Sequence, residues 1–164
     1  MLLKKNSVVG FPVPVERLAE SIGAKVVFND FNEEISGLLL RTNENLIIGV
    51  AKEQPLTRQR FTIAHEIGHI LLHEFSDVHV DKNFAVMFRS AESSTAQDVF
   101  EIEANAFAAE LLMPEAFLEK ELRTTSLDVE DDEQLRRLAK KYQVSSQAMT
   151  YRLHNLMARH RLPV

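Results

Sequence analysis

Residues 60–74 read RFTIAHEIGHILLHE, and this stretch decides most of what the chain can be. His65 and His69 stand four residues apart, and a helix turns about 100° per residue, so both imidazoles lie on one helix face. Two rings on one face can bind the same metal ion, and Glu66 directly after the first ring can act on a water held there. This H-E-x-x-H pattern is typical of a zinc hydrolase site.

Composition limits the class of protein. The chain has 164 residues, 45% of them hydrophobic, which suits one folded domain with a real core. It contains no cysteine, so any metal must be held by His, Asp, Glu or water. The lack of cysteine fits a reducing compartment, and neither a signal-peptide core nor an apolar run of about 20 residues is visible. We therefore expect a cytoplasmic protein with no membrane partner.

The part before the motif helix alternates between short elements. Residues 15–22 have apolar positions at helical spacing and are followed by Gly23, a common helix end. Three stretches rich in aliphatic and β-branched residues then predict strands, at residues 25–28, 36–41 and 45–50. The Thr-Asn-Glu-Asn turn between the last two strands favours a hairpin.

The part after the motif helix is mostly helical. Residues 75–98 show poor periodicity, with a short strand at 84–88 as the one element they suggest. A helix is expected from about residue 98 to Pro114, and a short helix after it. The tail has two further amphipathic stretches, separated by a turn at residues 144–146.

These elements predict an α+β fold. We expect a small twisted β-sheet packed against the H-E-x-x-H helix and a second helix that supplies a ligand, followed by a helical, helix-turn-helix-like tail. Residues 1–120 would form the metallopeptidase-like domain. Residues 121–164 would form the tail, packed on the same core.

The second helix offers two acids for the third metal ligand. Glu101 and Glu103 point about 200° apart on a helix, so both cannot serve. Glu101 shares its face with small and apolar residues and is the predicted ligand, while Glu103 stays the alternative. Asn105, one turn after Glu101, is then placed to hold a ligand histidine. His73, one turn after His69, is a rival ligand.

The segments RFTIAHEIGHILLH and EIEANAFAAELLMP resemble the ImmA/IrrE family of zinc-peptidase-like proteins, with the Glu-x-x-x-Asn arrangement of gluzincin peptidases. VERLAESIGAKVV and EISGLLLR are similar to the family's first helix, strand and hairpin, and LAKKYQVSSQAMTYRLHNL to its tail. The resemblance covers nearly the whole chain in the same order. One departure is Val50-Ala51, where many members carry Val-Asn.

The resemblance implies a site-specific peptidase that binds one Zn²⁺ per chain, with Mn²⁺ as an alternative, and that cleaves or inactivates a helix-turn-helix transcriptional repressor. Metal and Glu66 would activate a water for attack on a peptide carbonyl, after which Glu66 would protonate the leaving amine. The strand at residues 46–50 is expected to pair with the substrate as an edge strand. Four side chains are candidates for stabilising the oxyanion: His73, His79, Arg89 and Tyr142.

A second class of function keeps the same residues. The site can be catalytically idle, in a regulatory or toxin–antitoxin module that acts by binding a repressor or DNA. The tail contains several Arg and Lys residues, and Ser145, Ser146 and Gln147 stand where a DNA-reading helix would begin. The formal net charge of −5 weighs against DNA binding and favours a tail that packs on the core or docks to the repressor.

Overall fold

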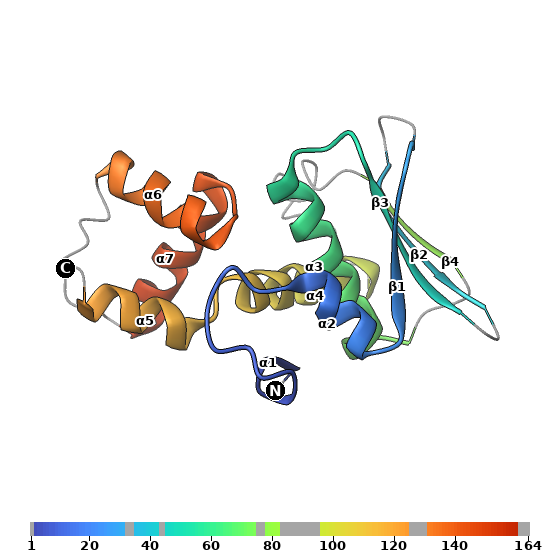
Figure 1. Ribbon diagram of the computed structural model, residues 1–164, viewed down its shortest axis with the longest axis horizontal. Helices are drawn as coiled ribbons and strands as arrows, with labels where there is room; N and C mark the ends of the chain where they lie inside the picture. The colour runs from blue at the N-terminus through green and yellow to red at the C-terminus, as the bar shows by residue number, and fades with distance from the viewer. Residues whose placement is uncertain are drawn as a thin grey trace.

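The computed structural model describes residues 2–31, 35–42, 45–74, 78–82, 96–124 and 131–160. The fold is α+β, as predicted, with a sheet on one side and helices on the other (Figure 1). The strands are β1 (Ala24–Asn29), β2 (Ile35–Arg41), β3 (Leu46–Ala51) and β4 (Val78–Lys82). The helices are α1 (Leu2–Lys5), α2 (Val15–Ser21), α3 (Leu56–Leu72), α4 (Ala96–Leu112), α5 (Glu115–Thr124), α6 (Asp132–Tyr142) and α7 (Ser146–His160).

The sheet has the strand order β1-β3-β2-β4. β2 and β3 form the predicted antiparallel hairpin, with Leu39 opposite Ile48, while β1 runs parallel to β3. β3 is therefore an interior strand, and the expectation that residues 46–50 form a substrate-pairing edge is wrong. Its backbone hydrogen bonds are already used by a neighbouring strand on each side, which the aliphatic sequence alone does not reveal.

The fourth strand, β4, was not predicted from the sequence. β4 pairs antiparallel with β2, and among the described residues it ends the sheet. Its sequence, VHVDK, alternates over only five residues and lies in a polar, aperiodic region, so local pattern gives little signal. The short strand expected at residues 84–88 lies outside the described residues.

Helix α3 packs against the sheet and against α4, and α2 lies beside it (Figure 1). Its central residues, from Thr62 to His69, are all buried, so the metal-binding motif lies in the interior. Gly68 faces α4 at close range: a Cβ there would stand 3.1 Å from the Cα of Ala104. The missing side chain allows the two helix backbones to approach, which brings α4 within reach of the histidines.

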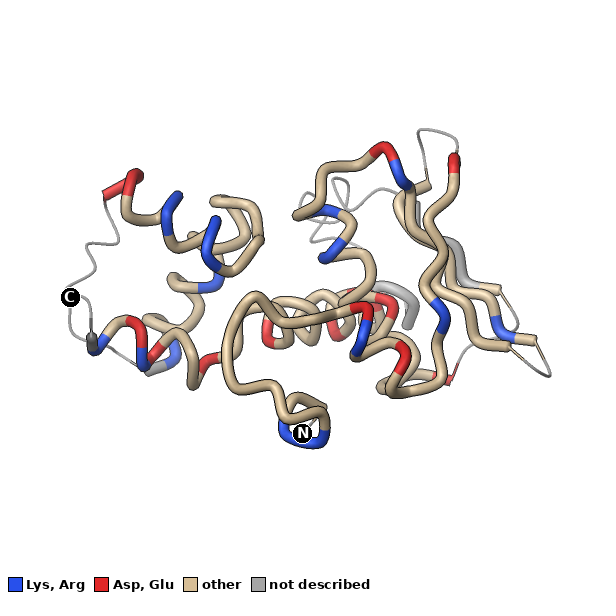
Figure 2. The backbone as a smooth tube through the Cα atoms, viewed as in Figure 1, with Lys and Arg blue, Asp and Glu red and all other residues tan. Residues whose placement is uncertain are grey.

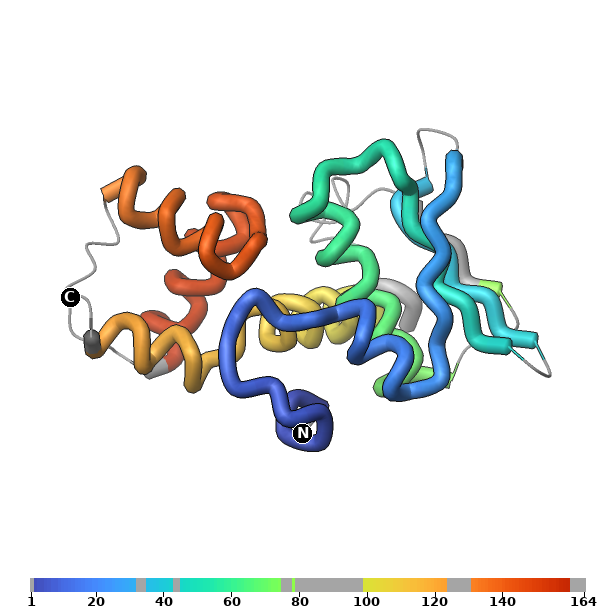
Figure 3. Tube along the Cα trace, viewed as in Figure 1, coloured from blue at the N-terminus to red at the C-terminus, as the bar shows by residue number. Residues whose placement is uncertain are grey.

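The tail helices share one hydrophobic core with the rest of the chain. Leu135, Met149 and Leu153 belong to the same buried cluster as Ile63 and Ile67 of α3. The N-terminal segment runs from the tail side of the molecule towards the sheet (Figure 3), and its Phe11 ring stacks on Tyr142 at 4.2 Å between centroids. The division at residue 120 stays a prediction.

Two buried arginines connect the tail to the helices of the metal-binding motif. Arg60 of α3 donates to the carbonyls of Val13, at 2.8 Å, and Gln143, at 3.3 Å, and burial lowers its pKa. Arg152 of α7 donates to the carbonyl of Met113 at 3.1 Å and pairs with Glu110. Because a buried guanidinium without acceptors is costly, both contacts hold the tail in a defined position.

Candidate metal centre

Helix α3 presents two imidazoles side by side in the interior. His65 and His69 are 0% and 3% exposed, and their Nε2 atoms lie 2.9 Å apart. The spacing of four residues places the rings one turn apart on the same face. Both rings therefore direct the same kind of nitrogen, Nε2, to one point.

Helix α4 adds a carboxylate at this point. Glu101 has one oxygen 3.3 Å from the Nε2 of His65 and the other 3.2 Å from the Nε2 of His69. One ligand atom from each of these three residues lies within 4.8 Å of the other two. Two neutral imidazoles and one carboxylate are a donor set that suits Zn²⁺ and leave a fourth tetrahedral position open. The residues present therefore fit a catalytic metal.

Asn105 of α4 contacts the ring of the first histidine. Its Oδ1 lies 3.1 Å from the Nδ1 of His65, at the opposite side of the ring from Nε2. An amide oxygen can only accept, so Nδ1 carries the proton and donates it. The Nε2 lone pair is then directed at the metal locus, which is the arrangement that metal-binding histidines usually have.

A second pair of residues performs the same task for His69. The Nδ1 of His69 lies 3.2 Å from the Nδ1 of His73, whose Nε2 lies 2.9 Å from a carboxylate oxygen of Glu103. If His69 gives its Nε2 lone pair to a metal, its Nδ1–H donates to His73, and the Nε2–H of His73 donates to Glu103. The ring of Phe100 stacks on His73, at 4.4 Å between centroids.

The alternatives for the third ligand thus occupy different places. Glu101 lies beside both Nε2 atoms, while Glu103, two residues later, faces away from them and pairs with His73. Among the described residues, the group of donors close enough to share an ion contains His65, His69 and Glu101, and neither His73 nor Glu103.

Glu66 is completely buried and lies on the sheet side of α3. Strand β2 passes so close that a Cβ at Gly37 would stand 2.8 Å from the Oε1 of Glu66 and 2.6 Å from the Cγ2 of Thr62. An alanine here would therefore force one or both of these side chains to move. Gly37 was not predicted as a residue of the site, although a glycine inside a strand is a signal of close approach.

The structure bears on two of the oxyanion candidates. Tyr142 is 0% exposed and packs on Phe11, and burial raises the pKa of its hydroxyl. A fully buried hydroxyl cannot touch a peptide substrate. His73 is engaged by Glu103. The side chain of His79 and the whole of Arg89 lie outside the described residues.

The basic side chains of the tail are largely matched by acids. On α6, Arg136 lies 3.7 Å from Asp132, Arg137 pairs with Glu133, and Lys141 lies 2.5 Å from Glu121. Figure 2 shows acidic residues at the start of α6 and basic residues along the rest of it. Paired charges contribute less to phosphate binding than free ones.

Within the described ranges, none of the helices combines the length and the hydrophobicity that a membrane span needs.

Comparisons with known proteins agree with this picture. The model of the M78 peptidase family, described as IrrE N-terminal-like domain, matches residues 19–154. An uncharacterized immunity region protein 2 of Bacillus phage phi105 is 26% identical over 114 residues, which are 70% of this chain and 66% of that protein.

A solved structure titled Mycobacterium tuberculosis transcriptional regulator superposes with a TM-score of 0.63 at 15% identity. The superposition covers 93% of this chain but 43% of the regulator, so the chain spans less than half of that protein, and the likeness concerns the fold. The family match covers both the H-E-x-x-H helix and the Glu101 helix, as the resemblance in sequence implied. The chain therefore belongs to the M78 peptidase family of IrrE N-terminal-like proteins.

Proposed function

We propose that this protein is a zinc-dependent endopeptidase that cleaves, and so inactivates, a helix-turn-helix transcriptional repressor in the cytoplasm. One observation carries the catalytic half of the proposal. The Nε2 atoms of His65 and His69 and the carboxylate of Glu101 meet at one buried point, with Glu66 in the next position along the same helix. Family membership supports the same reaction.

Each residue has a distinct task in this proposal. His65, His69 and Glu101 hold the ion, Asn105 fixes the tautomer of His65, and Glu66 takes a proton from the attacking water. Zinc in such a site lowers the pKa of water and polarises a carbonyl. Glu66 then delivers the proton to the nitrogen of the departing amine, which balances the hydrolysis.

We propose that His73 and Glu103 orient the ring of His69, as Asn105 orients the ring of His65. We assign them to the ring of His69, because their contacts reach its Nδ1 and not the metal locus. Zinc is proposed over Mn²⁺ because imidazole ligands suit zinc, whereas Mn²⁺ prefers oxygen ligands.

The proposed substrate is inferred from the names of two similar proteins. One relative is named for a phage immunity region, and the similar solved structure is titled a transcriptional regulator. The name of the solved structure refers directly to the control of transcription. The two names support a repressor as the target, since proteolysis of a repressor is an irreversible switch.

Replacing Glu66 with Gln tests this function. Cells that express the wild-type chain, or the Glu66→Gln chain at the same level, are compared by mass spectrometry of protein N-termini. We expect new N-termini within a helix-turn-helix repressor in the wild-type cells alone, with equal zinc content in both purified proteins, because Gln keeps the shape but removes the base. If repressor inactivation survives Glu66→Gln undiminished, the chain acts by binding and is not a peptidase.

A further inference from the structure

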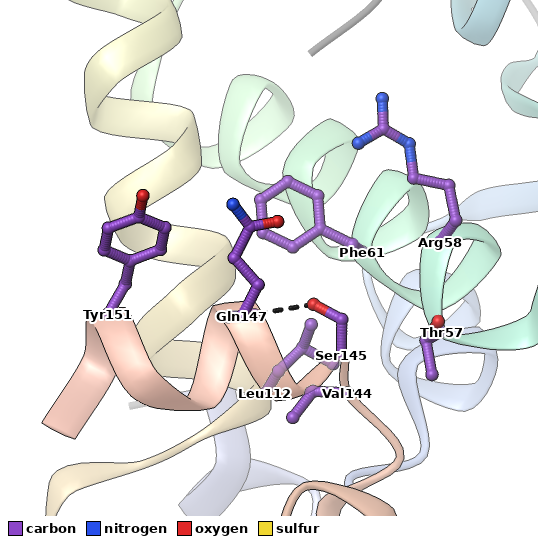
Figure 4. Close-up of a pocket in the computed structure, with 9 residues that line it drawn as sticks. Thr57, Arg58, Phe61, Leu112, Val144, Ser145, Gln147 and Tyr151 are labelled. Carbon is purple, nitrogen blue, oxygen red and sulfur yellow. Dashed lines mark hydrogen bonds between the residues drawn. The ribbon is translucent and has the colours of Figure 1, made fainter. Parts of the chain in front are cut away.

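A cavity of about 170 Å³ lies where the first turns of α3 meet the end of α4 and the start of α7 (Figure 4). Thr57, Arg58, Ser145 and Gln147 line part of it, and the larger, apolar part is formed by Phe61, Leu112, Val144, Ala148 and Tyr151. Three of these five residues come from the tail. In Figure 4, the ring of Phe61 projects from α3 towards Gln147 and Tyr151 of α7.

Phe61 connects this cavity to the metal centre. It stands one helical turn before His65, and the two rings are stacked with 6.3 Å between centroids. On α4 the same direction leads from Glu101 through Asn105 to Leu112, at helical spacing. The helical rise puts Leu112 about 16 Å from Glu101 along α4. An extended peptide advances about 3.3 Å per residue, so a side chain about three to five residues from a bond held at the metal reaches the cavity.

The size and lining select the occupant. Engineered apolar cavities of about 150 Å³ bind benzene, so this cavity has room for one large apolar side chain. Most of the lining is apolar, and Thr57, Ser145 and Gln147 offer neutral polar groups, so a charged side chain would lose more hydration there than an apolar one. The guanidinium of Arg58 donates to the Oγ of Ser36, which is not part of the lining, at 3.2 Å.

We propose that this cavity is a substrate subsite that takes one leucine, methionine or phenylalanine side chain from a peptide whose scissile bond lies at the metal centre. The part concerning the scissile bond rests on the proposed peptidase function. The proposal also gives the tail a task. Val144, Ala148 and Tyr151 form part of the substrate-binding surface. Ala148 and Tyr151 lie on α7, the helix that would read DNA if the tail acted as a helix-turn-helix, and Val144 lies in the turn before it.

The first experiment measures the cavity without any catalysis. Wild-type protein is titrated with N-acetyl-L-leucinamide and with N-acetylglycinamide while the amide and methyl signals of Ala148 are followed by NMR. We expect the leucine compound to bind about ten- to hundredfold more tightly, which is the value of burying its side chain. Equal affinities, or shifts that avoid Ala148, would overturn the subsite.

A matched pair of variants links the cavity to specificity. Ala148→Phe fills the cavity from the half-buried wall of α7, and Ala158→Phe makes the same change at an exposed position of the same helix. Ala148→Phe should abolish leucinamide binding and Ala158→Phe should not. The comparison of the two compounds on the wild type needs no variant and stands even if Ala148→Phe folds poorly.

The second experiment uses a peptide library made from a digested proteome, with all three proteins loaded with zinc. We expect wild type and Ala158→Phe to prefer Leu, Met or Phe at one position about three to five residues from the cleaved bond. Ala148→Phe should lose that preference and keep its zinc. Cleavage without an apolar preference, or with one that Ala148→Phe leaves unchanged, would overturn the proposal.

The remaining outcomes separate the two hypotheses. If leucinamide binds at Ala148 but no peptide is cleaved, the cavity still binds an apolar side chain. The proposed peptidase function is then contradicted. If Ala148→Phe slows cleavage of folded proteins but not of peptides, the cavity docks a partner surface remote from the scissile bond, and the subsite is wrong.

Discussion

The Oδ1 of Asn105 lies 3.1 Å from the Nδ1 of His65, although the two residues are 40 positions apart in sequence. The contact joins α4 to α3 beside the candidate metal centre. Because an amide oxygen accepts a hydrogen bond, it selects the His65 tautomer whose Nε2 lone pair is available to a metal.

Asn105→Ala should weaken zinc binding by about 10- to 100-fold, the usual cost of losing the partner of a ligand histidine. Asn105→Asp keeps an acceptor at the same place and should retain most of the affinity. Competition titrations against a zinc chelator measure both variants. Equal affinities for wild type and Asn105→Ala would show that the contact does not orient the ring.

Glu101→Ala should lower the affinity for zinc much more than Glu103→Ala does. Glu101 lies beside both Nε2 atoms, so its loss removes a ligand and should lower affinity by more than about 100-fold. Glu103 contacts His73, so its loss should cost about tenfold or less. Metal analysis of the purified variants decides between them. Zinc kept in Glu101→Ala but lost in Glu103→Ala would reverse the ligand assignment.

Gly37→Ala should impair cleavage while the protein keeps its metal. The new Cβ would stand 2.8 Å from the Oε1 of Glu66 and 2.6 Å from Thr62, so one or both side chains must move. A base displaced by about 1 Å can cost about 100-fold in rate, and overpacking of this kind costs about 1–3 kcal/mol of stability. Peptide cleavage, zinc content and thermal unfolding are measured together.

The matched control for Gly37→Ala is Gly10→Ala, because a Cβ at Gly10 would meet nothing within 4 Å. This variant should behave as wild type in all three measurements. Full cleavage activity in Gly37→Ala would mean that Glu66 does not need its place beside β2.

The start of α6 should become less stable in acid. Asp131 accepts hydrogen bonds from the side chain of Gln134 and from the backbone N–H groups of Gln134 and Glu133, and these bonds lower its pKa below 3.8. A carboxylate with a lowered pKa in the folded state stabilises the fold above pH 3.8, and this contribution is lost as the pH falls through the folded pKa.

Asp131→Asn isolates this effect, since all other acids are common to both proteins. The melting temperature of the wild type should exceed that of Asp131→Asn at pH 7, and the difference should shrink below pH 3.8. A difference that is independent of pH would show that the charge of Asp131 contributes nothing.

The amino-acid sequence determined the local part of this protein. The four-residue spacing of His65 and His69 commits both rings to one face of any helix that contains them, and the β2–β3 turn commits two strands to a hairpin. The opposite directions of Glu101 and Glu103 also follow from helix geometry alone. Such features depend on the periodicity of a helix or strand, which is determined by residues close together in the sequence.

The tertiary structure decided which of these groups meet. The close approach of α3 and α4 at Gly68 brings Glu101 to the imidazoles of His65 and His69. In the same packing of the two helices, Glu103 contacts His73. Strand order also depends on long-range pairing, so β3 became interior and β4 was invisible in the sequence. The cavity beside Phe61 has walls from three helices, and no local pattern encodes a space that exists only where distant segments pack together.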